Sequence, residues 1–334
     1  MKFSLIVCTY MRPEPLLKLL KSVQGQNLYP NEILIIDGST NNKTETILKE
    51  NSFQYLKYEL VSDENRGLTK QRNFGISKVA KDIDIVCFLD DDTVLEPDYF
   101  QNLLNTYKVY PEALGAGGYI INNNANWERH VDKDVINYKY FYFDMWKRKY
   151  SQRFILRKKI GLLDDSPPGI VPDFGHGKAM SYFPPTNKIY KTEFFLGGVS
   201  SFRKCILETI KFSEYFEGYG LYEDADFTIR VSKVGNLYVN TSARLFHFHD
   251  DDGRPNQFQY GKMVLRNGWY VWRVSFPKPR LKARIKWNLT ALFLTVVRAT
   301  NILNSKKKKE ALTETAGRIY GWFSILFNPP KEKH

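Results

Sequence analysis

The sequence has 334 residues, of which 43% are hydrophobic and 25% are charged, the ordinary composition of a globular protein with a large core. Its three cysteines, Cys8, Cys87 and Cys205, lie far apart and mostly within apolar runs, which argues against a disulfide framework and predicts reduced, buried thiols. The net charge of +13 is uneven, because residues 254–334 hold 17 Lys/Arg against 3 Asp/Glu and the remainder is nearly neutral. We therefore expect a neutral domain, residues 1–253, and a basic extension suited to a membrane leaflet or nucleic acid.

Strands and helices are expected to alternate along the first third of the chain. Apolar runs predict strands at 3–8, 32–36, 53–61, 83–89 and 113–121. Helices are predicted between them, beginning at Pro13, at Thr44, at Asn65 or Gly67, and at Asp98. This alternation predicts an α/β fold with a doubly wound, mainly parallel sheet. The apolar stretch at 3–8 is also too short for a secretory signal peptide.

Three adjacent aspartates, Asp90, Asp91 and Asp92, directly follow the strand predicted at 83–89. Ligands of open α/β sheets bind at the carboxyl ends of the strands, where Thr9 would also lie. Neighbouring carboxylates repel one another, so a cation or a set of hydrogen-bond donors is expected to offset their charge. The alternative is a solvated acidic turn that caps the next helix.

The middle of the chain is harder to interpret. Residues 122–190 combine aromatic and basic side chains, which predict helical structure at 138–157, with a loop rich in proline and glycine from residue 166. So long an irregular stretch in a compact domain is usually functional or disordered. Regular structure then returns with a helix predicted at 223–234 and a strand at 237–247.

Beyond residue 257, tryptophan and phenylalanine alternate with lysine and arginine. The apolar stretch at 288–297 is flanked by Lys286 and Arg298 and is too short to span a bilayer. A basic helix with aromatic side chains and one apolar face favours binding in the plane of a membrane surface. The alternative is a helical extension that packs on the main domain, with Lys306–Lys309 as a solvated turn.

Six short motifs follow one another in a fixed order. They are SLIVCTY at residues 4–10, IIDGST at 35–40, Asn65–Gly67 with Lys70–Gly75, the aspartates at 90–92, GGVSSFR at 197–203, and Glu223-Asp224-Ala225-Asp226 with Arg230. Together they resemble the pattern of family 2 glycosyltransferases with the GT-A fold, of the type that builds bacterial surface polysaccharides. The resemblance covers residues 1–250 and implies a nucleotide-diphosphate sugar as donor.

The resemblance implies roles for the residues at the sheet edge. A divalent cation, Mn²⁺ or Mg²⁺, would neutralise the diphosphate as it leaves, and Asp92 and His247 are its expected ligands. The expected donor nucleotide contacts are Thr9, Asp37, Arg72, Asp90 and Asp91. Asp90 would contact the ribose or a metal-bound water, and Gly38 stands where the commonest form of the motif has a second aspartate.

The resemblance also implies a catalytic base, because the acceptor hydroxyl must lose a proton as it attacks the sugar. We assign that role to Asp224, which opens the helix predicted at 223–234. Gly198 and Glu223 are expected to contact the donor sugar or the acceptor, and Asp226 to be structural. His249 would share a strand face with His247, and residues 250–252 could form a solvated turn or a lid.

The expected function is metal-dependent, inverting transfer of a hexosyl or deoxyhexosyl group to a hydroxyl of a glycan or lipid-linked glycan, on the cytoplasmic face of the cell membrane. A sugar nucleotidyltransferase is an alternative, although the N-terminal region lacks a glycine-rich triphosphate loop. A non-catalytic protein that binds membranes or polyanions is a second alternative. No nucleic-acid partner is expected, since the sequence shows no recognised reader motif.

Overall fold

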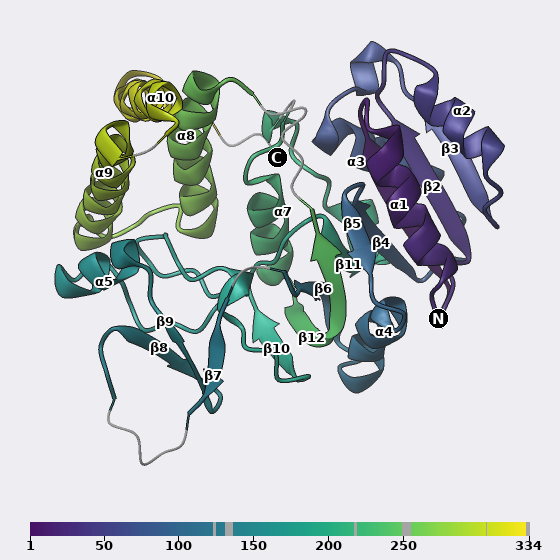
Figure 1. Ribbon diagram of the computed structural model, residues 1–334, viewed down its shortest axis with the longest axis horizontal. Coiled ribbons are helices and arrows are strands. Elements are labelled where there is room, and N and C mark those ends of the chain that lie inside the picture. Colours follow the sequence, from purple (N-terminus) through teal and green to yellow (C-terminus); the bar gives the residue numbers. More distant parts are fainter. Residues whose placement is uncertain (123–124, 131–135, 217–218, 249–254, 305, 332–334) are drawn as a thin grey trace. The chain divides into compact units, whose positions relative to one another are not determined.

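The computed structural model of the protein describes residues 1–122, 125–130, 136–216, 219–248, 255–304 and 306–331 (Figure 1). By its internal contacts the chain forms two compact units. Residues 1–124 and 185–253 form one, here called the sheet unit, and residues 125–184 and 254–334 form the other, the helix unit. The domain boundary expected at residue 253 stays a prediction; the contacts group residues 125–184 with the C-terminal helices.

The sheet unit contains most of the strands. In chain order its elements are β1 (Phe3–Thr9), α1 (Pro13–Gln24), β2 (Glu32–Asp37), α2 (Lys43–Glu50), β3 (Leu56–Leu60), the 3-10 turn Asp63–Asn65, α3 (Leu68–Lys78), β4 (Ile85–Asp90), β5 (Thr93–Leu95), α4 (Tyr99–Val109), β6 (Ala113–Ile120), β10 (Ile189–Thr192), β11 (Val199–Arg203), α6 (Lys204–Thr209), the 3-10 turn Glu214–Phe216, α7 (Glu223–Ser232) and β12 (Asn236–His247). The predicted strands and helices of residues 3–121 are confirmed to within a few residues at their ends.

The strands form one sheet in the order β10-β12-β6-β11-β4-β1-β2-β3, and β5 pairs with β12. Neighbours β3, β2, β1 and β4 are parallel, whereas β11 is antiparallel to both β4 and β6. The prediction of a doubly wound, mainly parallel sheet is therefore confirmed. Cys8 lies opposite Asp90 in the register of β1 and β4, so the carboxyl ends of these strands meet at one edge.

Helices cover both faces of the sheet. Alternate strand residues such as Leu5 and Cys87 pack with the apolar sides of α1, α2 and α4 in one core cluster. On the opposite face, an added Cβ at Gly75 of α3 would lie 3.0 Å from the side chain of Ile6. Phe88 on that face contacts Phe212 edge to face. The central strands are thus buried on both sides, which explains their continuous apolar sequences.

The helix unit combines a small sheet with long helices. Its elements are β7 (Trp127–Arg129), β8 (Tyr140–Phe143), β9 (Trp146–Lys149), α5 (Gln152–Lys159), the 3-10 turn Met180–Tyr182, α8 (Gln257–Ser275), α9 (Leu281–Asn304) and α10 (Lys308–Phe327). Helix α10 packs closely on α8. Only glycine fits at position 317, since an added Cβ there would lie 2.0 Å from the carbonyl oxygen of Phe258. Among the described residues, no helix has the length and apolar character needed to span a bilayer.

Helical structure over residues 138–157 was a wrong prediction. The antiparallel strands β8 and β9 occupy most of this segment, and helix begins only at Gln152. Phe141 and Phe143 alternate with Tyr140 and Tyr142 across β8, so one face joins a buried aromatic cluster and the other does not. The segment is dense in aromatic residues, and aromatic side chains favour a half-buried strand over a helix.

The three cysteines were predicted to be buried, and this is confirmed in full only for Cys87. Cys87 is buried in β4, Cys8 is partly buried, and Cys205 is exposed at the start of α6. All three are free, as expected. Burial raises the pKa of the Cys8 thiol to about 12, so this thiol is protonated at neutral pH.

Candidate functional site

The three aspartates after β4 point to different partners. Asp90 remains partly exposed, with 36% of its side chain accessible. Its backbone N–H donates to the carbonyl of Gly198, which lies directly before β11. An added Cβ at Gly198 would lie 2.0 Å from the Asp90 carboxylate, so only glycine leaves room for this carboxylate.

Asp91 turns into the protein and is buried. Thr9 at the end of β1 donates its hydroxyl to Asp91 Oδ2 over 2.7 Å. Arg12, just before α1, places Nη1 2.8 Å from Asp91 Oδ1. Burial raises the pKa of Asp91 to about 7, although Arg12 and Thr9 act in the opposite direction. Asp91 therefore links the ends of β1 and β4 and does not face solvent.

Asp92 lies between a second nitrogen of Arg12, at 2.9 Å, and the imidazole of His247, also at 2.9 Å. The pairing of β12 with β5 produces this approach, because His247 lies opposite Thr93 in the register. Burial would raise the pKa of Asp92, but the hydrogen bonds from His247 and Arg12 outweigh it and hold this pKa well below its usual range. Conversely, burial lowers the pKa of His247, and the neighbouring carboxylates reverse that effect and raise it.

Asp90, Asp92 and His247 could hold a metal ion together. One ligand atom from each lies within 4.8 Å of the others. Two carboxylates and an imidazole form a donor set suited to Mn²⁺ and related divalent cations. The glycine at 198 leaves the Asp90 carboxylate accessible, so these residues fit the cation that the sequence implies.

Arg72 on α3 is the buried cation of the second half of the site. It forms an ion pair with Glu223 and lies 3.6 Å from Asp90 Oδ1. Its guanidinium packs over the rings of Phe88 and Phe212. Burial raises the pKa of Glu223, and Arg72 opposes this shift. Arg72 thus joins the acids of β4 to those of α7.

Asp224 lies in the first turn of α7 and is half-buried. Its Oδ1 accepts the N–H of Ala225 at 2.8 Å, and its Oδ2 accepts the N–H of Gly197 at 3.3 Å. Burial raises the pKa of Asp224, although these backbone bonds and Arg72 favour the ionised form. A half-buried carboxylate with a raised pKa is suited to accept a proton. We call Asp90, Asp91, Asp92, Glu223 and Asp224 the acidic centre.

Asp37 occupies a separate position at the end of β2. It is fully buried, accepts the backbone N–H of Ser39 at 2.8 Å and accepts the hydroxyl of Tyr58 at 2.9 Å. Gln71 lies under the following turn, where it donates to the carbonyl oxygens of Thr9 and Ile36. Asp37 therefore shares the sheet edge with the acidic centre but forms a structured turn of its own.

Sequence reasoning missed Arg12, which contacts two of the three aspartates. A signal existed: Arg12 follows β1 within three residues, and the end of β1 was predicted to lie at the same sheet edge as the three aspartates. Asp226, expected to be structural, pairs with Arg230 at 2.7 Å. His249, Gly218 of the loop before Asp224, and residues 250–252 lie outside the described residues.

The sequence is similar to those of known glycosyltransferases. Residues 4–167 match the sequence model of "Glycosyl transferase family 2". A glucosyl-dolichyl phosphate glucuronosyltransferase of Haloferax volcanii is 32% identical over 126 residues, which are 36% of this chain and 39% of that protein. The glycosyltransferase GlyA of Streptococcus pneumoniae is 31% identical over 125 residues, 37% of this chain and 18% of that protein. The chain thus matches well under half the length of these relatives.

Solved structures show the same fold. The crystal structure of S. aureus TarS superimposes with a TM-score of 0.50 and 17% identity, covering 92% of this chain and 46% of that one. TarS 1–349 in complex with UDP-GlcNAc also gives a TM-score of 0.50, with 14% identity, and covers 99% of this chain and 93% of that one. The mixed α/β sheet with a helical C-terminal region is therefore of the GT-A type, as the sequence predicted.

Proposed function

Residues 4–167 belong to glycosyl transferase family 2, and we propose that the protein transfers a sugar from a nucleotide-diphosphate donor to a hydroxyl group of a glycan or lipid-linked glycan. The observation that carries the proposal is the cluster of Asp90, Asp92 and His247 beside Asp224 at the carboxyl edge of the sheet. Such a cluster supplies both a cation site and a proton acceptor, which this reaction requires.

The cation site serves the leaving diphosphate. Asp90, Asp92 and His247 would hold Mn²⁺ or Mg²⁺, and the bound ion would offset the charge that develops on the diphosphate. Arg72, fixed by its ion pair with Glu223, would add positive charge on the same side. Thr9 and Asp37 end the adjacent strands, where the nucleoside would bind, and Asp91 holds Thr9 and Arg12 in place.

Asp224 would act as the catalytic base. As the acceptor hydroxyl attacks the anomeric carbon, its proton passes to the Asp224 carboxylate, and the bond from that carbon to the diphosphate oxygen breaks. Attack from the face opposite the leaving group inverts the anomeric centre. The N–H of Gly197 holds Oδ2 of Asp224 in position, and Gly198 and Glu223 border the space for the sugars.

A binding panel tests the donor and cation site together. UDP, dTDP, GDP and CMP are titrated calorimetrically with and without Mn²⁺. We expect one diphosphate to bind at least about tenfold more tightly with Mn²⁺, and Asp92→Asn to remove this metal-dependent gain. The matched control is Asp82→Asn, an exposed aspartate that pairs with Lys2 near the opposite ends of β1 and β4.

Absence of binding by the folded protein would contradict the proposal and favour a non-catalytic protein that binds polyanions. Pyrophosphate release from a nucleoside triphosphate and a sugar phosphate would instead identify the nucleotidyltransferase alternative. TarS is similar in fold and is described in complex with UDP-GlcNAc, so UDP is the first member of the panel.

A further inference from the structure

The outer face of α9 carries a row of exposed apolar side chains. They recur every three or four residues along most of the helix: Leu281, Ile285, Leu289, Leu292, Val296 and Leu303. At its two ends, Leu281 is 72% exposed and Leu303 is 77% exposed. The opposite side packs into the helix unit, where Trp287 stacks on Trp272 of α8. A helix of an ordinary globular unit would show polar side chains on its outer face.

Helix α10 has a second row of the same kind. Its exposed apolar residues are Leu312, Ile319, Tyr320, Phe323, Leu326 and Phe327. Phe327 is 86% exposed and Leu326 is 68% exposed. The packed side of α10 is lined by glycine, since an added Cβ at Gly321 would lie 2.9 Å from the carbonyl oxygen of Lys262 on α8.

The two rows lie on the same side of the α9–α10 pair. The helices are antiparallel, because Arg298 pairs with Glu314 near the connection whereas Trp322 donates to Asn288 at 2.9 Å farther from it. Leu289 follows Asn288, and each step along a helix rotates the side chain by about 100°.

Phe323 likewise follows Trp322, so it lies about 100° around α10 in the same rotational sense. Asn288 and Trp322 face each other across the two helices. In an antiparallel pair, the residues that follow two facing residues point to the same side of the pair, so Leu289 and Phe323 do so. The two rows therefore form one surface, which we call the apolar face. Exposed contiguous apolar surfaces of this kind mark interaction sites.

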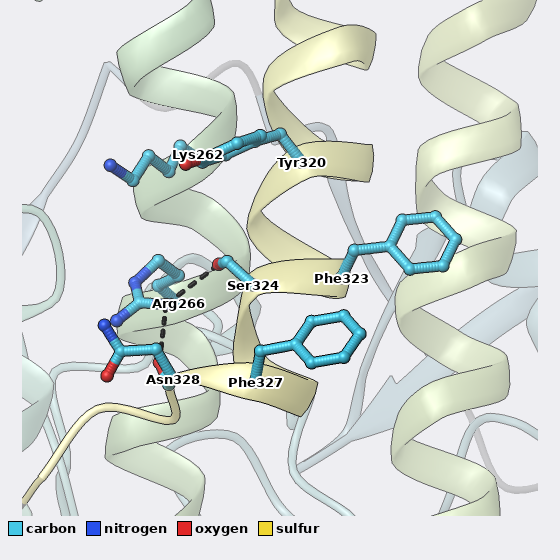
Figure 2. A pocket seen from close by; sticks show the side chains of 7 residues that line it. All are labelled: Lys262, Arg266, Tyr320, Phe323, Ser324, Phe327 and Asn328. Carbon is cyan, nitrogen blue, oxygen red and sulfur yellow. Dashed lines mark hydrogen bonds between the residues drawn. The ribbon is translucent and has the colours of Figure 1, made fainter.

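Basic side chains border the apolar face. A hollow of about 420 Å³ is lined by Lys262 and Arg266 of α8 and by α10 residues that include Phe323 and Phe327 (Figure 2). Arg266 is held there by Ser324 Oγ at 2.8 Å and by the carbonyl of Asn328 at 2.9 Å.

Further exposed cations are Lys282 on α9 and Lys306–Lys309, which span the turn before α10 and its first residues. Glu314, one of the few acids of this segment, is buried and paired with Arg318 and Arg298. The surface around the apolar face is thus strongly positive.

We propose that the apolar face docks this protein on an anionic phospholipid bilayer, with lipid phosphates at Lys262 and Arg266 and the aromatic side chains of α10 in the headgroup–acyl boundary. Charge decides the occupant, because residues 254–334 hold 17 basic and 3 acidic residues and two such surfaces repel each other. A nucleic acid would satisfy the cations and leave the apolar rows in water. An anionic leaflet satisfies both. This docking is independent of the transfer reaction.

Vesicle flotation tests the docking. The full chain is mixed with phosphatidylcholine vesicles that contain either no anionic lipid or about 30 mol% phosphatidylglycerol. We expect binding to the anionic vesicles that weakens as salt is added. Phe323→Ser combined with Phe327→Ser should lower this affinity at least about tenfold, and Lys262→Ala combined with Arg266→Ala should lower it for anionic vesicles only. The control is Val234→Ser, a comparably exposed apolar residue of the sheet unit.

Several outcomes would overturn the docking. One is unchanged vesicle binding by the double phenylalanine variant, and another is no vesicle binding by the folded wild-type chain. A dimer in sedimentation analysis that the phenylalanine variant converts to a monomer would assign the face to a second copy. Nucleotide binding by each variant is measured in parallel, so a failure of the docking and a failure of the proposed transfer are distinguishable.

Discussion

Both units bury carboxylates next to arginines, but the balance of charge is opposite. In the sheet unit, four of the five carboxylates of the acidic centre contact Arg12, Arg72 or His247, and the fifth, Asp224, accepts backbone N–H groups. This leaves an excess of negative charge. In the helix unit, the single carboxylate of Glu314 lies 2.7 Å from Arg298 and 2.7 Å from Arg318.

The difference separates a binding site from a structural contact. Excess carboxylates at a partly open sheet edge create a place where a cation or a proton is taken up, and this arrangement reduces the stability of the fold. A carboxylate enclosed by two guanidiniums has its charge compensated within the protein, and its loss leaves buried cations without their partner. Substitutions in the acidic centre should therefore lower activity with little loss of stability. Substitution of Glu314 should lower stability and leave nucleotide binding unchanged.

The largest effect is expected for Asp224→Asn. Loss of the proton acceptor should lower kcat by about 10³-fold, because general base catalysis contributes on this order. Binding of the nucleotide diphosphate should stay close to that of the wild type, since Asp224 does not belong to the cation cluster. Steady-state kinetics and calorimetry measure the two quantities, with Asp82→Asn as the control. A kcat within threefold of wild type would assign the base to another residue.

Glu314→Gln should have the opposite signature. It leaves Arg298 and Arg318 partly unpaired and should lower the free energy of unfolding by about 3 kcal/mol, with nucleotide binding unchanged below the transition. Denaturant titration checks this value. Glu310→Gln is the control, because Glu310 forms a 3.5 Å contact with exposed Lys307 and should change stability by less than about 0.5 kcal/mol. Equal effects of both substitutions would refute the structural role of Glu314.

Two glycines provide a matched steric test. At Gly198 and at Gly317, an added Cβ would lie 2.0 Å from the nearest atom, the Asp90 carboxylate in one case and the carbonyl of Phe258 in the other. Gly198→Ala should lower kcat/KM by about tenfold through displacement of Asp90, with little change in stability. Gly317→Ala should lower the free energy of unfolding by about 2 kcal/mol and leave kcat/KM unchanged. If both substitutions lower kcat/KM, or both lower the free energy of unfolding, the assignment of activity to the sheet unit and of a structural role to Gly317 is wrong.

The smallest effect concerns pH. Burial raises the pKa of Asp224, so the carboxylate becomes protonated, and kcat falls, at a pH above the ordinary aspartate value. At neutral pH the ionised carboxylate is less favourable in the folded than in the unfolded chain, so Asp224→Asn should raise the melting temperature slightly. A pH–rate profile and thermal denaturation check both statements. An acid limb that persists unchanged in Asp224→Asn would contradict the first.

Much of the sheet unit could be predicted from the sequence. The strands around Val7 and Cys87 are apolar on both faces, and only a central parallel strand with helices on both sides satisfies that pattern. The start of helix α1 could be predicted from Pro13, because proline is favoured in the first turn of a helix. Asp90 and Asp224 could be placed at one sheet edge because strand ends and helix starts in this topology converge there.

Residues 138–157 could not be read in the same way. Their aromatic side chains favour a strand, but the basic side chains among them were read as one face of a helix, so the local pattern gave conflicting indications. The choice was made by long-range contacts, such as Arg148 stacked over Trp127 of β7 and over Tyr182. Cation–aromatic packing of this kind joins residues distant in the chain and leaves no local period in the sequence.

By itself, the sequence determined the alternation of strands and helices, the position of Asp90, Asp91 and Asp92 after a central strand, and the concentration of positive charge beyond residue 254. These features depend on local patterns and on composition. Only the tertiary structure decided that Arg12 bridges Asp91 and Asp92 and that His247 reaches Asp92. It also decided that the apolar rows of α9 and α10 share one side. Such pairings depend on strand register and helix rotation, which are set by packing between distant segments of the chain.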